Sequence, residues 1–176
     1  MGSSETYTMA ETKLKRIAWL SASDPEKRFD SLMHHFNQES LAACFAELDG
    51  SKATGIDGVT KAQYGEHLDE NLSDLVVRMK RMSYRPAPIR QALIPKEGQA
   101  GATRELGISI LEDKIVQKMM QKVLESIYEP LFLDCSYGFR AGRGCHDAIK
   151  ALHQHLWGHA PRALGPAAPL SHRFPP

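Results

Sequence analysis

The chain has 176 residues, of which 42% are apolar and 24% charged, and its net charge is +1. This composition is typical of a globular domain with a real core, and no run of 18 apolar residues predicts a membrane span. The three scattered cysteines, Cys44, Cys135 and Cys145, include no CxxC pair, so we predict no disulfide framework, no zinc site and a reducing, cytoplasmic location.

The N-terminal third is predicted to be helical after a disordered start. Residues 1–13 are polar, and we predict that they are disordered. A helix is predicted over 24–36, because Pro25 suits a first turn and the apolar residues that follow keep helical spacing. A second helix is predicted over 41–48, with Asn37 as its N-cap and Gly50 beyond its end.

A glycine-punctuated loop follows at 51–60. Gly55 and Gly58 bracket Ile-Asp, which predicts a tight turn rather than a phosphate cradle, because no Lys-Ser/Thr pair follows. Thr60 and Gln63 match a capping box. The helix that they open is predicted to run to Met82, with an interruption near residues 71–73 and a basic last turn.

A β-hairpin is predicted next, because two short apolar runs, 89–94 and 106–108, flank a glycine-containing loop at 96–104. From Arg78 to Arg104 there are seven cations and one anion, against a net charge of +1 for the whole chain. Two interpretations stay open at this point. The basic hairpin binds a phosphate-bearing partner, or it is a solvated edge whose charges prevent aggregation.

The strongest predicted helix follows the hairpin. Ser109 and Glu112 match a second capping box. Apolar residues then repeat every three or four positions from Ile115 to Leu131, with Pro130 near the end, so we predict that this face is core.

The loop at 136–144 alternates aromatic and arginine residues among glycines. Tyr137 and Phe139 offer stacking faces, and Arg140 and Arg143 offer guanidinium forks, which suits a nucleic-acid strand. The alternative is a loop held in the core by its aromatic residues. A last helix is predicted over 146–157, with Ile149, Leu152 and Leu156 facing inward. Residues 158–176 hold five of the ten prolines and no acid, so we predict a disordered tail that is out of frame.

Taken together, these motifs resemble the N-terminal part of a bacterial group II intron-encoded reverse transcriptase and maturase. The resemblance covers residues 14–157. It rests on the order of seven short segments: Gly-Ile-Asp-Gly-Val at 55–59, Tyr-Arg-Pro at 84–86, Ile-Pro-Lys at 94–96, Thr-Arg at 103–104, Leu-Gly-Ile at 106–108, Leu-Glu-Asp-Lys-Ile-Val-Gln at 111–117, and Ser-Tyr-Gly-Phe-Arg with Gly-Arg at 136–143.

The resemblance implies an α+β fold, mostly helical with one small antiparallel hairpin. It corresponds to the N-terminal extension, fingers and start of the palm of a right-hand polymerase, and is incomplete. In that family the hairpin closes over the incoming dNTP, and its lysine and arginine, here Lys96 and Arg104, bind the triphosphate. We assign contacts with template or intron RNA to a wider set of side chains: Arg85, Arg90, Tyr137, Arg140 and Arg143.

Two departures from the family pattern affect these sites. The chain has Glu105 where the family usually has proline, and this acid could pair with Arg104 and weaken its hold on phosphate. Ala141 also replaces a proline, which loosens the loop by less than about 1 kcal/mol through the entropy of the unfolded chain.

A larger departure concerns Mg²⁺, of which a polymerase uses two ions held by carboxylates. The family supplies these ligands from motifs that this sequence lacks, and no Asp-Asp pair occurs in it. We therefore predict no catalytic residue and no metal ligand here, and expect a fragment that is inactive alone. The alternative is a non-catalytic RNA-binding module that assists intron splicing. A third possibility is a poorly folded product of gene decay.

Overall fold

The computed structural model describes residues 3–98 and 101–158. They belong to two compact units, with the division between Leu131 and Phe132, and each unit is described separately. Within the described residues the only sheet is a two-stranded antiparallel hairpin, and the other regular elements are helical. The predicted α+β class is confirmed at this level. The tail predicted from residue 158 lies, from 159 on, outside the described residues.

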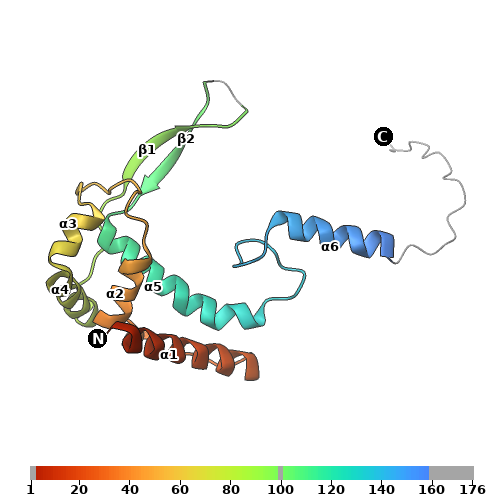
Figure 1. Cartoon of the computed structure of the whole chain (residues 1–176), viewed down its shortest axis with the longest axis horizontal. Helices are drawn as coiled ribbons and strands as arrows, with labels where there is room; N and C mark the ends of the chain where they lie inside the picture. The colour runs from red at the N-terminus through yellow and green to blue at the C-terminus, as the bar shows by residue number, and fades with distance from the viewer. Residues whose placement is uncertain (1–2, 99–100, 159–176) are drawn as a thin grey trace, which may run out of the picture. The chain divides into compact units, whose positions relative to one another are not determined.

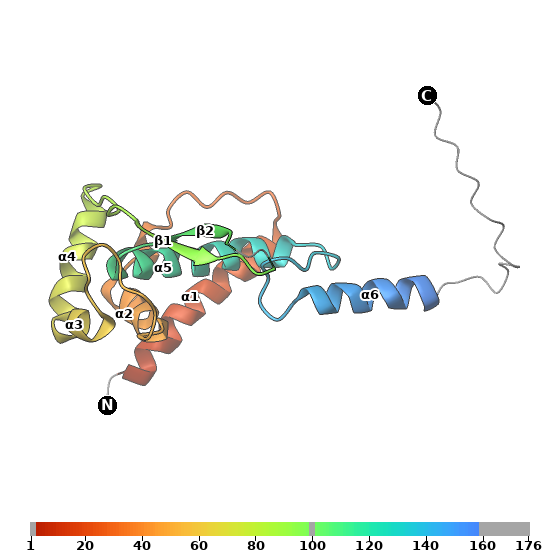
Figure 2. The same cartoon turned by 90° about the horizontal axis from the view of Figure 1, so that it is seen from above.

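The first unit begins with helix α1, Ser3–Ser23, which packs against helix α5, Leu111–Tyr128 (Figure 2). The backbone of residues 3–13 is thus helical, which differs from the disorder predicted for residues 1–13. Packing stabilises α1 from its middle onward, because Leu14 lies against the core and the C-terminal part of the helix contacts α5. The buried Ser21 hydroxyl donates to the Ile127 carbonyl at 2.6 Å and fixes this contact.

The helix predicted over 24–36 does not form. The Asp24 carboxylate accepts from the Glu26 amide at 3.2 Å, and the Asp24 carbonyl accepts from the Lys27 amide at 3.1 Å, so Pro25 lies in a turn. The chain then runs extended to a 3₁₀ turn, η1, Met33–His35. Phe36 is buried, and Leu32 and Met33 pack against the core, so the apolar spacing is satisfied without a helix.

Three further helices complete the helical part of the first unit (Figure 1). Helix α2, Gln38–Glu47, is capped as predicted by Asn37, whose side chain accepts from the Ser40 amide at 2.9 Å. Helix α3, Lys61–Glu66, opens with the predicted Thr60–Gln63 capping box, and α4 spans Leu68–Lys80.

The helix interruption lies at His67, a few residues earlier than predicted. The Asn71 side chain donates to the Tyr64 carbonyl at 3.1 Å. It therefore satisfies an acceptor that the break leaves without its helical partner. Asn71 therefore lies in the first turn of α4, after the break, and not at the break as predicted.

The core lies where α2, α4 and α5 meet, and its fully buried side chains include Leu41, Cys44, Leu72, Leu75 and Ile115. Only part of the α5 face predicted to be core is buried. Val116, Met119 and Val123 are covered, whereas Met120, Leu124 and Tyr128 form an exposed stripe at four-residue spacing. Helix α5 ends at Tyr128 and continues as a 3₁₀ turn, η2, Glu129–Leu131.

The predicted capping box at Ser109 and Glu112 is wrong. The N-cap of α5 is Ile110, which has no side-chain cap, and the Glu112 carboxylate binds Arg78 instead. The Ser109 hydroxyl accepts from the Gln117 amide nitrogen at 3.4 Å.

The second unit contains a loop over residues 132–144 and helix α6, Cys145–Gly158. The helix begins one residue before the predicted position. Ile149, Leu152 and Leu156, which we predicted to face inward, are each at least 59% exposed.

Candidate nucleic-acid interface

The hairpin consists of β1, Arg90–Pro95, and β2, Thr103–Ile108, and projects from the helices of the first unit (Figure 1). Its register pairs Arg90 with Ile108 and Ile94 with Arg104. Cross-strand partners share a face, and alternate residues of a strand share a face. Arg90 and Arg104 therefore lie on the same face of the hairpin, and both are exposed.

Lys96 joins these two arginines. Its amide donates to the Ala102 carbonyl at 2.9 Å, which continues the ladder one step beyond the last strand pair. That step places Lys96 on the face of Arg90 and Ile94, diagonally across from Arg104. We call Arg90, Lys96 and Arg104 the basic face. None of the three has an ion pair with another described residue.

Glu105 lies on the opposite face, where it is the partner of Leu93. Neighbouring residues of a strand point to opposite sides of the sheet, so Glu105 does not compete for the Arg104 guanidinium. The Glu105–Arg104 ion pair that the sequence left open is not formed among the described residues. This departure from the family pattern leaves the basic face intact.

The tip of the hairpin needs glycine at two positions. Gly98 and Gly101 have φ of +76° and +79°, in the left-handed region that other residues rarely adopt. Gly98 follows the end of β1 and Gly101 precedes the start of β2.

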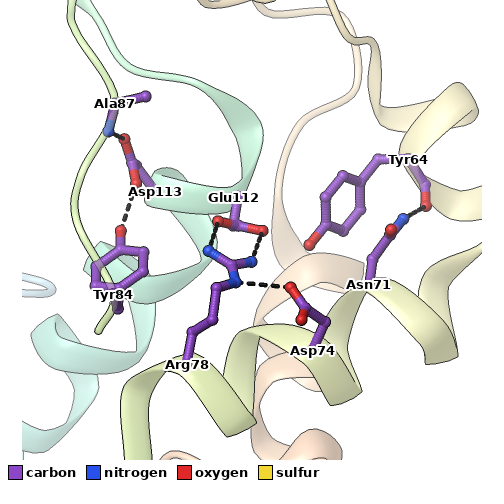
Figure 3. A network of polar contacts seen from close by, with 8 residues as sticks. All are labelled: Tyr64, Asn71, Asp74, Arg78, Tyr84, Ala87, Glu112 and Asp113. Carbon is purple, nitrogen blue, oxygen red and sulfur yellow. Dashed lines mark hydrogen bonds and ion pairs between the residues drawn. The ribbon is translucent and has the colours of Figure 1, made fainter. Parts of the chain in front are cut away.

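The base of the hairpin is held by a buried carboxylate (Figure 3). Asp113, on the first turn of α5, is 3% exposed. It accepts from the Tyr84 hydroxyl and from the Ala87 amide, the latter at 3.0 Å. Burial and the bond to Asp113 raise the pKa of Tyr84. The segment that leads into β1 is therefore tied to α5.

A second set of polar contacts joins α4 to α5 beside this carboxylate (Figure 3). The Arg78 guanidinium donates to both oxygens of Glu112, at 3.0 and 2.7 Å, and its Nε donates to Asp74 at 2.6 Å. These bonds raise the pKa of Arg78. We call Arg78, Asp74 and Glu112 the clamp. Arg78 was counted among the seven cations of the basic stretch, but it does not add to the free positive charge of the hairpin. The i, i+4 spacing of Asp74 and Arg78 in the sequence indicated that the two side chains could pair.

The glycine loop at 51–60 supports the same junction. A Cβ on Gly55 would lie 2.5 Å from Ile110 Cα and 2.6 Å from Ile110 N, so the loop backbone touches the start of α5. Gly58, with φ of +70°, closes the predicted turn by donating to the Gly55 carbonyl at 3.3 Å. The Lys114 ammonium donates to the Ala53 carbonyl at 2.8 Å. This loop is a structural brace.

Arg85, predicted to bind nucleic acid, lies exposed on the segment before β1. Its guanidinium donates to the Tyr84 carbonyl at 3.1 Å and reaches the Met82 carbonyl at 3.5 Å. Met82 is 80% exposed and has φ of +56°, so this corner is sharply turned.

In the second unit, Arg140 and Arg143 bind the carbonyl groups of their own loop. Arg140 donates to the Leu133 and Ser136 carbonyls, both at 3.0 Å, and Arg143 donates to the Asp134 carbonyl at 2.6 Å. Their guanidinium groups also lie over the Phe132 and Tyr137 rings. Both side chains therefore organise the loop, a role that the sequence pattern did not distinguish from strand binding.

Phe139 is the aromatic residue that this loop presents outward. It is fully exposed, and its φ of +58° is unusual for a bulky residue. Tyr137, in contrast, is half-buried beneath Arg143. Of the two aromatics in the predicted stacking pattern, Phe139 is the one whose ring is open to a partner.

Among the residues that the structure describes, no three His, Cys, Asp or Glu side chains are grouped so as to hold a metal ion. Two aspartates near the predicted sites have partners within the chain: Asp113 binds Tyr84 and Ala87, and Asp134 pairs with Arg143 at 3.4 Å. No described helix is long and apolar enough to pass through a bilayer.

No protein-family model matches the chain. Relatives nevertheless cover most of it. Protein YkfC of Escherichia coli K12 is 34% identical over 82% of this chain and 38% of its own length. The group II intron-encoded protein LtrA of Lactococcus lactis is 30% identical over 82% of this chain and 24% of its own length. An uncharacterized 91 kDa protein in a cob intron of Schizosaccharomyces pombe is 38% identical over 49% of this chain and 10% of its own length. The chain thus spans well under half of each relative.

Proposed function

Because this chain is a homologue of group II intron-encoded proteins, we propose that it provides the nucleotide- and RNA-binding fingers of an RNA-directed DNA polymerase of that kind. In this proposal the first unit comprises the N-terminal extension and fingers, and the residues that follow begin the palm. One observation carries the proposal: the basic face puts three exposed cations, none paired with an acid among the described residues, on one side of a projecting hairpin.

The basic face suits a triphosphate. Arg90, Lys96 and Arg104 supply charge and several N–H donors toward one side, and a triphosphate is a compact, multiply charged acceptor. Glu105 lies on the other side of the hairpin and does not oppose this binding. Asp113 holds the segment that leads into β1, and the clamp joins α4 to α5, so neither uses a side chain of the strands that carry the cations.

We propose that this chain alone does not synthesise DNA. Two Mg²⁺ ions in a polymerase need several carboxylates converging on one point, and the described residues do not fit that requirement. A primer-extension assay with Mg²⁺ and dNTPs should therefore give no product. Robust extension by the purified chain would refute this part of the proposal.

Binding of the nucleotide can be tested separately from synthesis. We expect a titration with Mg²⁺·dATP, followed by ¹H–¹⁵N NMR, to shift the amide signals of the hairpin. The double variant Lys96→Gln/Arg104→Gln should lose about tenfold or more in affinity, because two charge-assisted contacts disappear.

The matched control is Lys80→Gln/Arg81→Gln, which removes two exposed cations from the end of α4 instead. It should keep at least half of the affinity of the unmodified chain. Equal losses in the two double variants would mean that only overall charge attracts the nucleotide. That result would reject a site on the basic face.

A second candidate function is binding of single-stranded RNA by the second unit, without synthesis. The fully exposed Phe139 ring favours it, because bases stack on exposed aromatic side chains at about 1–3 kcal/mol per base. Replacing Phe139 with Ala should weaken binding of a single-stranded intron RNA in fluorescence anisotropy. Leu133→Ala, which removes another exposed apolar side chain of the same loop, is the control.

The arginines of this loop need a different test. Arg140→Gln/Arg143→Gln should weaken RNA binding and its dependence on salt, and should also make the loop more sensitive to proteolysis, because the carbonyl contacts are lost. Unchanged RNA affinity in both this variant and Phe139→Ala would exclude the second candidate.

A further inference from the structure

A cavity of about 410 Å³ lies between α1 and the extended segment that follows it. Figure 2 shows this segment leaving the end of α1 and running back along the helix toward α2. The volume is within the range of small-molecule sites, about 300–1,000 Å³. The cavity lies in the first unit, well away in sequence from the hairpin and the clamp.

The walls of the cavity are strongly basic. Lys13 and Arg16 line it from α1, and Lys27 and Arg28 line it from the returning segment. None of these four has an ion pair with a described residue. Asp30 is the one acid among the lining residues. All four are exposed to solvent, and cations grouped around one opening attract an anion.

The rest of the lining is apolar. Ile17 is 6% exposed, and Leu20, Phe29 and Leu32 are half-buried around it. A ligand that covers half-buried apolar side chains is stabilised, because it removes their remaining surface from water. The cavity therefore combines a basic wall with an apolar surface.

The environment of His35 agrees with this picture. This residue lines the cavity, is 5% exposed and stacks against His34. Burial, His34 and Lys13 together lower the pKa of His35. Protonation of His35 is therefore unfavourable, which is expected beside a site with an excess of positive charge.

We propose that this cavity binds a small organic anion with an apolar body. The anionic group would lie among Lys13, Arg16, Lys27 and Arg28, and the apolar body would cover Phe29 and Leu32. Two kinds of molecule have this chemistry at this size: a mononucleotide, with a phosphate on a flat ring system, and a medium-chain fatty acid. The site is separate from the nucleotide contacts proposed for the hairpin.

Isothermal titration of the full chain with AMP, dodecanoate and inorganic phosphate tests the proposal. We expect AMP or dodecanoate to bind more tightly than phosphate by at least about tenfold, because phosphate cannot use the apolar surface. The tighter of the two identifies the source of the ligand. Ser31→Phe, which fills the cavity without changing charge, should abolish this binding.

Charge variants distinguish binding in the cavity from general electrostatic attraction of anions to the chain. Arg16→Glu should reduce affinity by at least about tenfold, whereas Lys15→Glu, its neighbour on α1 outside the lining, should change it by less than threefold. Equal effects of the two variants would overturn the proposal. So would equal binding of phosphate and both organic anions, or binding of a single-stranded oligonucleotide with neither small anion.

Discussion

The clamp and the basic face place arginines in opposite situations within one unit. In the clamp, Arg78 is bonded to Glu112 and Asp74, and Asp113 beside it is buried with both oxygens bonded. On the basic face, Arg90, Lys96 and Arg104 are exposed and unpaired among the described residues. The chain joins the two regions twice, through residues 81–89 between α4 and β1 and through residues 109–110 between β2 and α5.

This difference separates charges that build the fold from charges that are free to meet a ligand. Bonded and partly buried charges contribute to stability, because removing one partner leaves the other charge without its hydrogen bonds. Exposed cations without partners contribute little to stability. Substitutions in the clamp and at Asp113 should therefore lower the free energy of unfolding, and substitutions on the basic face should leave it nearly unchanged.

The largest effect is expected for Asp113→Ala. It leaves the Tyr84 hydroxyl and the Ala87 amide without their acceptor, and should lower the free energy of unfolding by about 3 kcal/mol or more. Urea denaturation followed by circular dichroism measures this change. Asp113→Asn, which keeps the shape and an acceptor oxygen, should cost clearly less. Equal costs would show that packing, not hydrogen bonding, holds the base of the hairpin.

The next effect concerns the brace behind the clamp. Gly55→Ala should cost about 2–3 kcal/mol, because its new Cβ would meet the backbone of Ile110, which cannot rotate away. Gly58→Ala is the control: its Cβ would meet nothing within 4 Å, so only the strain of φ at +70° remains, about 1 kcal/mol. Thermal or urea unfolding of both variants checks the order. A larger cost at Gly58 would mean that turn conformation outweighs the loop contact.

The sequence predicted the elements whose signals are local. The hairpin, the Asn37 cap and the Thr60–Gln63 capping box each depend on residues close together in the chain, and all three form. The predictions were wrong where a contact with a distant part of the chain replaced the structure that the local pattern indicated. Glu112 matched a capping box but binds Arg78, 34 residues away, and the apolar spacing of residues 24–36 is satisfied by an extended segment on the core.

The sequence also predicted the residues of the candidate sites better than their arrangement in space. Lys96 and Arg104 were named from the sequence, but their common face with Arg90, opposite Glu105, follows from the strand register. Arg140 and Arg143 have the sequence pattern of a strand-binding loop, and only the structure shows that they bond to carbonyls of that loop. The cationic cavity was not predicted. The sequence feature that corresponds to it is a pair of short basic clusters, at 13–16 and 27–28. The turn at Pro25 brings these clusters together.

The smallest effects come from a direct comparison of two arginines, Arg78→Gln and Arg90→Gln, which remove the same charge. Arg78→Gln breaks three bonds to carboxylates that are partly exposed, so solvent screening reduces the loss to about 1–2 kcal/mol. Arg90→Gln should change the free energy of unfolding by less than about 0.5 kcal/mol, because the side chain is exposed and has no ion pair within the described part of the chain. The order should reverse for Mg²⁺·dATP, whose binding should weaken in Arg90→Gln and persist in folded Arg78→Gln. If Arg90→Gln instead destabilises the chain as much as Arg78→Gln does, the basic face is part of the fold, and its cations are not free for a phosphate.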